Sequence, residues 1–273
     1  MDAYFDIFSG ISGNMVLGAL LELGLDLDSL EEELEKLGLS DEYKIEVEKV
    51  LKEGIGGTHV EVKLIEHHHE HEHDHEHEHN HEHEHDHHHH HHHDHHHGRH
   101  LDDINKLIEE SSLSESIKEK SKAIFLKLAK AEAKIHGKDL NEIHFHEVGA
   151  VDAIVDIVGS VIGLELLGVE RIIASRLHIG TGFVHCAHGK MPVPAPATME
   201  ILEGLPVYST GIESELVTPT GAAIIATLAE EFTNRPEMEI KKTGYGAGTR
   251  ELEIPNLLRI NLGHFKSKKK VKS

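Results

Sequence analysis

One long polar tract limits what this chain can fold into, because it separates two stretches of ordinary globular sequence. Residues 67–100 contain 22 histidines, most of them alternating with glutamate or aspartate. The tract holds no apolar side chain, and the first one after it is that of Leu101. A segment without apolar side chains buries too little surface to offset the entropy that is lost on ordering. We therefore expect a disordered insert between two portions of one core, residues 1–66 and 101–263, and a disordered basic tail at 264–273.

The composition of the tract favours metal binding. Clustered neutral imidazoles bind nickel, zinc and copper, and neighbouring carboxylates attract the cation. An expression tag is the alternative explanation, but the tract is internal and interleaved with acids. Without fixed geometry it should concentrate metal weakly at many sites and not perform chemistry. The candidate ligands in its uninterrupted run are His87, His88, His89, His90, His91, His92 and His93.

The patterns on both sides of the tract predict an α+β protein with mixed sheet elements and several packed helices. We expect strands at 4–8, 43–47, 60–64, 171–178, 207–209, 238–242 and 257–262. We expect helices at 15–23, 29–37, 102–110, 114–136 and 222–232, and one that ends at Gly168. The proline-rich segment around Pro194 should be a rigid extended loop that lines a cleft.

Local signals suggest how some of these elements begin and how they are joined. Ser12 or Asn14 can cap the first helix, and the spacing from Ser29 to Glu32 fits a capping box for the second. A loop containing Gly54, Gly56 and Gly57 should join the first two long strands. The GYGAGTR segment, residues 244–250, should be a flexible glycine loop.

The charge and the cysteine content exclude some classes of protein. The formal net charge is -22, so we expect cations as partners and no binding to nucleic acid. No intramolecular disulfide can form because there is one cysteine, which favours a reducing compartment. The chain shows no leader pattern and no run of 18 apolar residues. We therefore expect no membrane partner and a cytoplasmic location.

The densest group of chemically active side chains outside the tract lies at residues 143–159. His144 and His146 alternate as on a strand, Asp152 and Asp156 share one face of a helix, and Glu147 lies between the two pairs. A turn at Gly149 would bring imidazoles and carboxylates together, as in divalent-metal and acid/base sites. A purely structural role is equally open. In that case Asp152 favours an early helical turn and the histidines are strand residues with satisfied hydrogen bonds.

Asp156 is conspicuous within this block. The helix that contains it is apolar over much of its surface, so the helix should be largely buried. A buried carboxylate is costly unless a cation, a metal or hydrogen-bond donors compensate it.

Three glycine-rich or hydroxyl-bearing segments are candidates for anion binding. The SGISGN segment precedes a helix, where free backbone N–H groups and the dipole favour a phosphate, although the segment alone favours a tight structural turn. TPTG precedes another helix, and GYGAGTR offers one guanidinium suited to bidentate recognition. The candidate ligand-binding residues are Ser9, Gly10, Ser12, Gly13, Thr218, Thr220, Gly221 and Arg250.

The segment HCAHG is a candidate for soft-metal binding. His185, Cys186 and His188 could form a mixed thiolate and imidazole site, or the thiol could be reactive. A lone cysteine that only packs in the core is the alternative. No spacing in the chain suggests a Ser/His/Asp arrangement, so the residues favour a divalent metal together with an anionic ligand.

Several of these motifs, in this order, resemble the LarC family, the nickel-insertion proteins of nickel-pincer cofactor biosynthesis. The resemblance rests on DIFSGISGNM, the internal histidine-rich insert, HFHEVGAVDAIVDIVG, HCAHGKMPVPAPAT, ELVTPTGAA and GYGAGTRE, and it covers the chain to about Gly263. It implies a cyclometallase that uses CTP, with Mg²⁺ or Mn²⁺, to insert Ni²⁺ into pyridinium-3,5-bisthiocarboxylic acid mononucleotide. The product serves lactate racemase and related enzymes.

The leading hypothesis from these residues is that the tract gathers Ni²⁺ and that the cluster from His144 to Asp156 receives or positions it. His146, Glu147, Asp152 and Asp156 would be catalytic, and His144, His146 and Asp156 would also bind metal. Full-length relatives look longer, so a C-terminal module of the family, or a second copy of the chain, is the expected partner. Asn14 stands where many relatives are expected to have aspartate, which removes a charge from any metal site there.

Two other functions remain open from the sequence. One is a nickel storage or delivery protein without catalysis, which the tract and the short length favour. The other is a metal-dependent phosphate-ester hydrolase, which would turn over simple phosphate esters without CTP.

Overall fold

The computed structural model describes residues 1–65, 99–143, 145, 150–186 and 189–266. The histidine-rich tract, including the run from His87 to His93, lies outside the described residues. So do His144, His146, Glu147 and His188.

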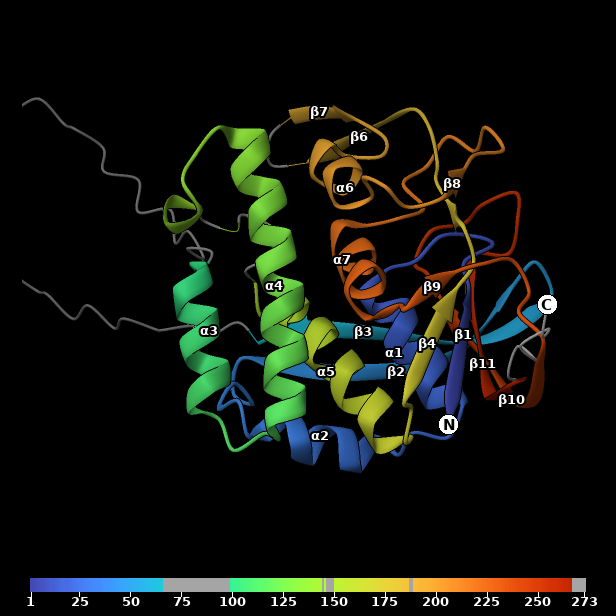
Figure 1. The fold of residues 1–273 in the computed structure, drawn as a ribbon, viewed down its shortest axis with the longest axis horizontal. Coiled ribbons are helices and arrows are strands. Elements are labelled where there is room, and N and C mark those ends of the chain that lie inside the picture. Colours follow the sequence, from blue (N-terminus) through green and yellow to red (C-terminus); the bar gives the residue numbers. More distant parts are fainter. Residues whose placement is uncertain (66–98, 144, 146–149, 187–188, 267–273) are drawn as a thin grey trace, which may run out of the picture.

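A mixed sheet of seven strands forms the centre of the described structure, in the order β2-β3-β10-β11-β1-β4-β9 (Figure 1). The pairs β2/β3, β10/β11 and β1/β11 are antiparallel, whereas β3/β10, β1/β4 and β4/β9 are parallel. The α+β class is therefore confirmed. The strands are β1 (Asp2–Asp6), β2 (Tyr43–Lys52), β3 (Ile55–Leu64), β4 (Arg171–Ala174), β9 (Glu231–Phe232), β10 (Met238–Ala247) and β11 (Leu257–Phe265).

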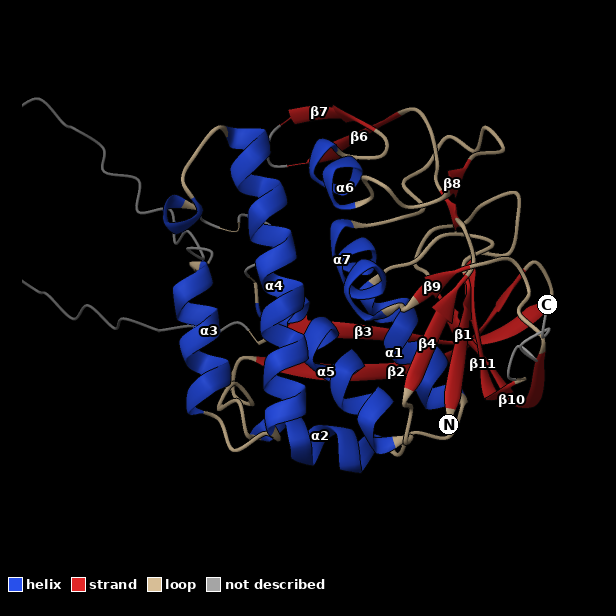
Figure 2. Ribbon diagram, viewed as in Figure 1, coloured by secondary structure: helices blue, strands red, loops and turns tan. Residues whose placement is uncertain are grey.

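Helices cover one face of this sheet (Figure 2). The helix α1 (Gly13–Glu22) contacts β3, β10 and β11, and α5 (Val151–Leu166) packs on α1. Gly246 makes the contact between α1 and β10 possible, since a Cβ there would lie 1.7 Å from the carbonyl oxygen of Met15. The other helices are α2 (Leu27–Glu35), α3 (Leu101–Glu110), α4 (Glu115–His136), the 3-10 turn η1 (Leu140–Glu142), α6 (Pro196–Ile201) and α7 (Pro219–Leu228).

The alternation of side chains along the strands separates a core face from a polar face. On β11, Leu258, Ile260 and Leu262 are fully buried toward the helices, whereas Arg259 and Asn261 occupy the intervening positions. This pattern is typical of a sheet with one face packed on the core and one face toward water. The hydrophobic core therefore lies between the sheet and α1, α5 and α7.

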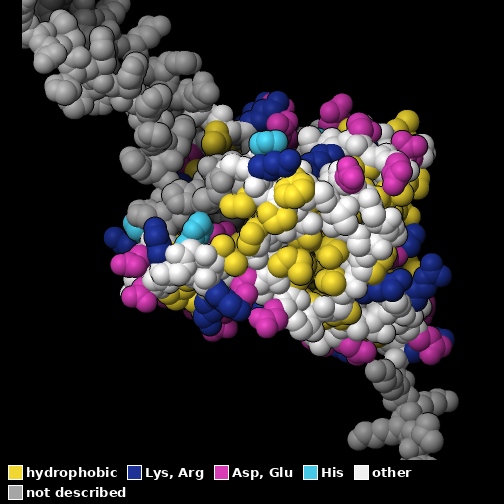
Figure 3. Space-filling model, turned by 90° about the horizontal axis from the view of Figure 1, so that it is seen from above, with side chains coloured by type: hydrophobic (Ala, Val, Ile, Leu, Met, Phe, Trp, Pro, Cys, Tyr) yellow, Lys and Arg dark blue, Asp and Glu magenta, His cyan; other side chains and the backbone are white. Residues whose placement is uncertain are grey.

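Two small sheets lie beside the main one. They are the parallel pair β5 (Leu177–His178) and β8 (Val207–Tyr208), and the hairpin of β6 (Phe183–Cys186) and β7 (Gly189–Pro192). Seen from the side of β6, β7 and α6, the surface carries a group of hydrophobic side chains (Figure 3). In the described part of the chain, no helix is long and apolar enough to span a membrane.

Most expected elements are present, but several predicted boundaries and connections are wrong. Asp26, not Ser29, caps α2, and its carboxylate accepts a hydrogen bond from the N–H of Ser29 at 3.0 Å. Gly56 and Gly57 belong to β3, because β2 and β3 continue pairing as far as Lys52 and Ile55. The last expected helix ends at Leu228, after which residues 231–232 form the edge strand β9.

Two segments expected to be loops contain regular structure. The first part of GYGAGTR completes β10, where Gly244 and Gly246 allow close packing of α1. The proline-rich segment is extended only up to Ala195, because Pro196 occupies the first turn of α6. Proline is tolerated there since the N–H groups of that turn have no partner within the helix.

Candidate functional site

Two loops that lead into helices lie side by side at one end of the sheet. One joins β1 to α1, and the other precedes α7. The N–H of Ile11 donates to the carbonyl of Leu216 at 2.9 Å, and the N–H of Thr218 donates to the carbonyl of Ile11 at 3.1 Å. These bonds form a parallel bridge between Ile11 and Val217. The N-terminal ends of α1 and α7 are thereby held next to each other.

Glycines permit this close approach. Gly10 has a φ of +90°, and a Cβ there would lie 1.9 Å from the carbonyl oxygen of Leu216. A Cβ on Gly221 would lie 2.3 Å from the carbonyl oxygen of Ile11. The contact between the two loops therefore requires a glycine at each of these positions, whether or not a ligand binds.

A small cavity of about 190 Å³ opens at this junction. Thr218 lies in its wall and also caps α7, since its Oγ1 accepts a hydrogen bond from the N–H of Gly221 at 3.1 Å. A phosphate or carboxylate group fits such a volume, whereas pockets for whole drug-sized ligands hold about 300 Å³ or more. The lining residues are Ser12, Asn14, Met15, Glu215, Leu216, Thr218, Gly248, Thr249, Arg250 and Asn256.

Arg250 is anchored at the edge of this cavity. Its Nη1 donates to the carbonyl of Glu215 at 3.0 Å and to Oγ of Ser214 at 3.2 Å, and its Nη2 lies 3.4 Å from Oε2 of Glu215. The carbonyl of Arg250 accepts a hydrogen bond from the side chain of Asn256 at 2.9 Å. The guanidinium is therefore held in place beside the cavity, with part of its charge balanced by Glu215.

Asp156 lies beneath the N-terminus of α1. A Cβ on Gly13 would lie 2.6 Å from Oδ2 of Asp156, so only glycine allows this carboxylate to approach the helix. The backbone N–H of Asn14 donates to the Asp156 carboxylate, while Oδ1 of Asp156 is buried without a hydrogen-bond partner among the described residues. Oδ1 of Asp152, one turn earlier on α5, is likewise buried and has none within that part of the chain.

Burial changes the acidity of both carboxyl groups. Burial, followed by repulsion from Asp152, raises the pKa of Asp156 to about 8, and the N–H of Asn14 partly opposes this rise. Burial also raises the pKa of Asp152. The pair can therefore hold a proton at neutral pH, and a divalent cation placed beside it would favour the charged forms and release that proton.

Polar contacts link the acid pair to the cavity. Asn14 is the shared residue, since its N–H reaches Asp156 while its side chain lines the cavity. Oγ of Ser12 donates to Oδ1 of Asn14 at 2.5 Å, and Nδ2 of Asn14 donates to the carbonyl of Val60 at 3.3 Å. Ser12 is the N-cap residue of α1, but its side chain bonds to Asn14 and makes no capping bond to the backbone.

The structure brings together only part of the predicted site. Ser12, Thr218 and Arg250 line one cavity, whereas Ser9 is fully buried with its Oγ unpartnered in the described part of the chain. Thr220 is part of the first turn of α7 but does not line the cavity. The glycines at positions 10, 13 and 221 act through close packing.

The predicted metal ligands are not assembled within the described residues. No group of three or more His, Cys, Asp or Glu side chains there could hold a metal ion. His185 is exposed on β6, and Cys186 ends the same strand. The remaining candidates, His144, His146, His188 and the run from His87 to His93, lie outside the described residues.

Sequence reasoning missed Glu215 and Asn256, which position Arg250. Glu215 is the first residue of the ELVTPTGAA motif but was not singled out there, and Asn256 lies in a segment without a distinctive pattern. The hydrogen bond from Asn256 joins residues six positions apart, and the bonds to Ser214 and Glu215 span 36 and 35 positions. The only available signal was that both residues lie close to segments already singled out, TPTG and GYGAGTR.

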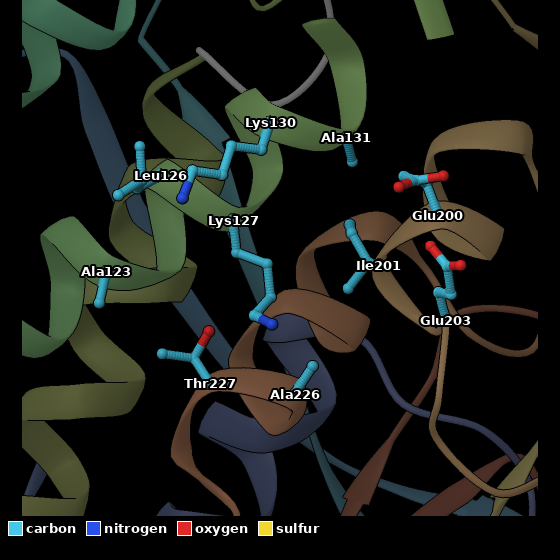
Figure 4. Close-up of a pocket in the computed structure, with 10 residues that line it drawn as sticks. All are labelled: Ala123, Leu126, Lys127, Lys130, Ala131, Glu200, Ile201, Glu203, Ala226 and Thr227. Carbon is cyan, nitrogen blue, oxygen red and sulfur yellow. The ribbon is translucent and has the colours of Figure 1, made fainter. Parts of the chain in front are cut away.

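A second hollow lies between α4, α6 and α7 (Figure 4). Its volume is about 620 Å³, and it is lined by Lys127 and Lys130 of α4, by Glu200 of α6 and by Glu203, which follows α6. Lys134 forms ion pairs with both glutamates, at 2.6 Å and 3.5 Å. None of the residues predicted for the site lines this hollow.

The fold and the site are those of a protein that binds an anionic ligand together with a cation. A mixed sheet places two helix N-termini, an anchored arginine and a buried acid pair at one end, which suits an anionic ligand and a cation. Residues 3–273 match the family model described as "Nickel insertion protein", and the chain belongs to this family.

Curated relatives agree with the family match. One relative, from Desulfitobacterium hafniense strain DCB-2, is named "Pyridinium-3,5-bisthiocarboxylic acid mononucleotide nickel insertion protein". It is 49% identical to this chain, over 96% of this chain and 58% of the relative. The Clostridium acetobutylicum protein of the same name is 52% identical, over 97% of this chain and 64% of the relative. The chain thus spans about three fifths of the length of these relatives. No solved structure is significantly similar to it.

Proposed function

We propose that this chain carries the nickel-receiving and substrate-holding part of an enzyme that inserts Ni²⁺ into pyridinium-3,5-bisthiocarboxylic acid mononucleotide. The observation that carries the proposal is the placement of Asp152 and Asp156 beside the N-terminus of α1, joined through Asn14 to an anion-sized cavity. The names of the relatives supply the identity of the metal and the substrate.

The acid pair has two tasks in this proposal. Its unpartnered oxygens, Oδ1 of Asp152 and Oδ1 of Asp156, attract the incoming cation, whose charge lowers the pKa of both groups. Bonding of nickel to a ring carbon replaces a C–H bond, so one proton must leave the ring. An ionised carboxylate of the pair accepts it in this proposal. His144, His146 and Glu147 complete the metal site from the neighbouring segment.

The cavity between α1 and α7 holds the phosphate of the mononucleotide. The positive ends of the two helix dipoles favour an anion there. Arg250 adds a fixed positive charge at the rim, and Ser12 and Thr218 add hydroxyl groups. His185, Cys186 and His188 pass metal toward the site, and Ser9 and Thr220 support the loops.

The histidine-rich tract acts as a nickel reservoir, and insertion consumes CTP with Mg²⁺ or Mn²⁺. The family resemblance supports the CTP requirement. The 190 Å³ cavity is too small for a whole nucleoside triphosphate. A C-terminal module, or a second copy of the chain, completes the reaction in the cytoplasm, and the product serves lactate racemase-type enzymes.

A nickel storage or delivery protein without catalysis is the second candidate. The histidine-rich tract favours it, because clustered imidazoles can hold many metal ions without a catalytic site. The two candidates differ in one experiment, incubation of the chain with Ni²⁺, CTP and the dithio-substrate, with and without a separately supplied C-terminal module. Mass spectrometry of a nickel-containing product supports the enzyme. Bound nickel without product in both incubations supports storage.

A further inference from the structure

Another ligand-sized hollow lies on the opposite face of the sheet from α1. It holds about 440 Å³, within the range of small-molecule sites. Gly244 and Gly246 of β10 face α1, so Tyr245 between them points to the other face, where it lines this hollow. The lining residues are Tyr4, Asp6, Arg235, Pro236, Met238, Ile240, Thr243, Tyr245, Arg259 and Asn261.

Strand register builds the floor of this hollow. Two rows of side chains cross β10, β11 and β1, since Asn261 is paired with both Thr243 and Tyr4, and Arg259 is paired with both Tyr245 and Asp6. The polar groups within a row also bond to one another, with Oγ1 of Thr243 donating to Oδ1 of Asn261 at 2.8 Å. The floor is therefore a rigid, polar and partly aromatic surface.

Arg259 is fixed in this floor with donors to spare. Its Nε donates to Oδ2 of Asp6 at 3.1 Å, its Nη2 contacts the same oxygen, and the guanidinium lies 5.6 Å from the centre of the Phe8 ring. A guanidinium has five N–H donors, so the bonds of Arg259 to Asp6 and to the side chain of Tyr245 use only part of its capacity. Such a preorganised group loses little entropy when it binds a carboxylate or phosphate.

The loop of residues 233–236 supplies a second cation. Arg235 has a φ of +49°, which is strained for a residue with a side chain, and its backbone N–H donates to Oη of Tyr4 at 3.0 Å. Its guanidinium forms no hydrogen bond or ion pair with the described residues. The lining carries two arginines and one aspartate, a local charge of +1 in a chain whose formal net charge is -22.

We propose that this hollow binds a small aromatic anion, a planar ring that bears a carboxylate or a phosphate group. Arg259 and Arg235 hold the anionic group, Tyr245 provides an aromatic surface for the ring, and the Thr243–Asn261 pair offers polar contacts at its edge. A structural ion pair between Arg259 and Asp6 alone would explain neither the second, uncommitted arginine nor the hollow above the pair. This hollow is separate from the proposed nickel site, so a negative binding result here would not contradict the proposed function.

Isothermal titration calorimetry with four simple compounds tests the proposal. Benzoate and phenyl phosphate carry the ring with each anionic group, benzamide carries the ring without charge, and inorganic phosphate carries the charge without a ring. We expect saturable binding of benzoate or phenyl phosphate, and the tighter of the two identifies the anionic group. Benzamide and inorganic phosphate should bind at least about tenfold more weakly, because each lacks one of the two contacts.

Variants assign the binding to the hollow. Arg235 is exposed, so Arg235→Ala should fold normally and weaken binding about tenfold through loss of a charge-assisted contact. Lys241→Ala removes the same charge from an exposed position of β10 outside the lining and should leave the affinity unchanged. Absence of saturable binding by both aromatic anions would overturn the proposal. Equal affinity of the wild type and Arg235→Ala, or equal binding of benzoate and benzamide, would do the same.

Discussion

Replacing Asp156 by asparagine should change how the stability of the protein depends on pH. Asparagine keeps the shape of the side chain and removes its titration. The folded protein raises the pKa of Asp156 from 3.8 to about 8, so folding favours the protonated form. In the wild type, the contribution of Asp156 to the free energy of unfolding is therefore complete below pH 4. It decreases progressively as the pH rises to about 8.

The expected change in the free energy of unfolding follows from the difference between the two pKa values. Each unit corresponds to 1.36 kcal/mol, so a rise of about four units makes ionised Asp156 cost about 6 kcal/mol. Between pH 5 and pH 7 the unfolded chain is almost fully ionised at this position and the folded chain is mostly protonated. The free energy of unfolding of Asp156→Asn, relative to the wild type, should therefore increase by roughly 3 kcal/mol over this interval.

Urea unfolding of both proteins at several pH values, without metal, measures this difference. Glu165→Gln is a matched control because Glu165 lies on the same helix, partly exposed near its C-terminal end. The control should keep a constant offset from the wild type. If Asp156→Asn also keeps a constant offset from pH 5 to pH 7, the buried carboxylate has an ordinary pKa and the assignment of a proton-holding acid pair is refuted.

Four further outcomes are expected from the same geometry. Gly13→Ala should lower stability by about 1–3 kcal/mol and impair nickel insertion, because the new Cβ would lie 2.6 Å from the Asp156 carboxylate; thermal unfolding and product yield measure the two effects. Thr218→Ala should cost about 1 kcal/mol in urea unfolding through loss of the α7 cap, and an unchanged midpoint would contradict that role. Deleting residues 67–97 should lower product yield at limiting nickel and not at saturating nickel, and loss of activity at both would exclude a reservoir. Nickel binding measured by equilibrium dialysis should fall below about pH 6, because imidazoles must be neutral to bind, and unchanged binding at pH 5 would point to carboxylate or thiolate ligands.

Local signals were sufficient for several helices. As its sequence suggests, α4 begins after the capping residue Ser114 and ends at Gly137. Gly137 has the left-handed conformation typical of a helix end. The unusual position of Asp156 was also visible in the sequence, because its helix is apolar on most sides. In these cases the decisive interactions lie within one element or its nearest neighbours.

Contacts between distant segments could not be predicted in this way. The glycines of residues 244–247 suggest a loop when read alone, and only the packing of α1 against β10 shows why a strand needs glycine there. The ion pair of Asp6 with Arg259 joins residues 253 positions apart. Anchoring of Arg250 by Glu215 likewise depends on how two loops meet, which no local pattern encodes.

Nickel insertion by acid-pair variants tests the central claim most directly. The chain, supplied with the C-terminal module, Ni²⁺, CTP and the dithio-substrate, should yield the nickel-containing product by mass spectrometry. Under the same conditions Asp156→Asn should yield at least about a hundredfold less, while its circular dichroism spectrum stays unchanged and Glu165→Gln retains wild-type yield. Insertion by Asp156→Asn at the wild-type rate would contradict the claim that the acid pair beside α1 receives the metal.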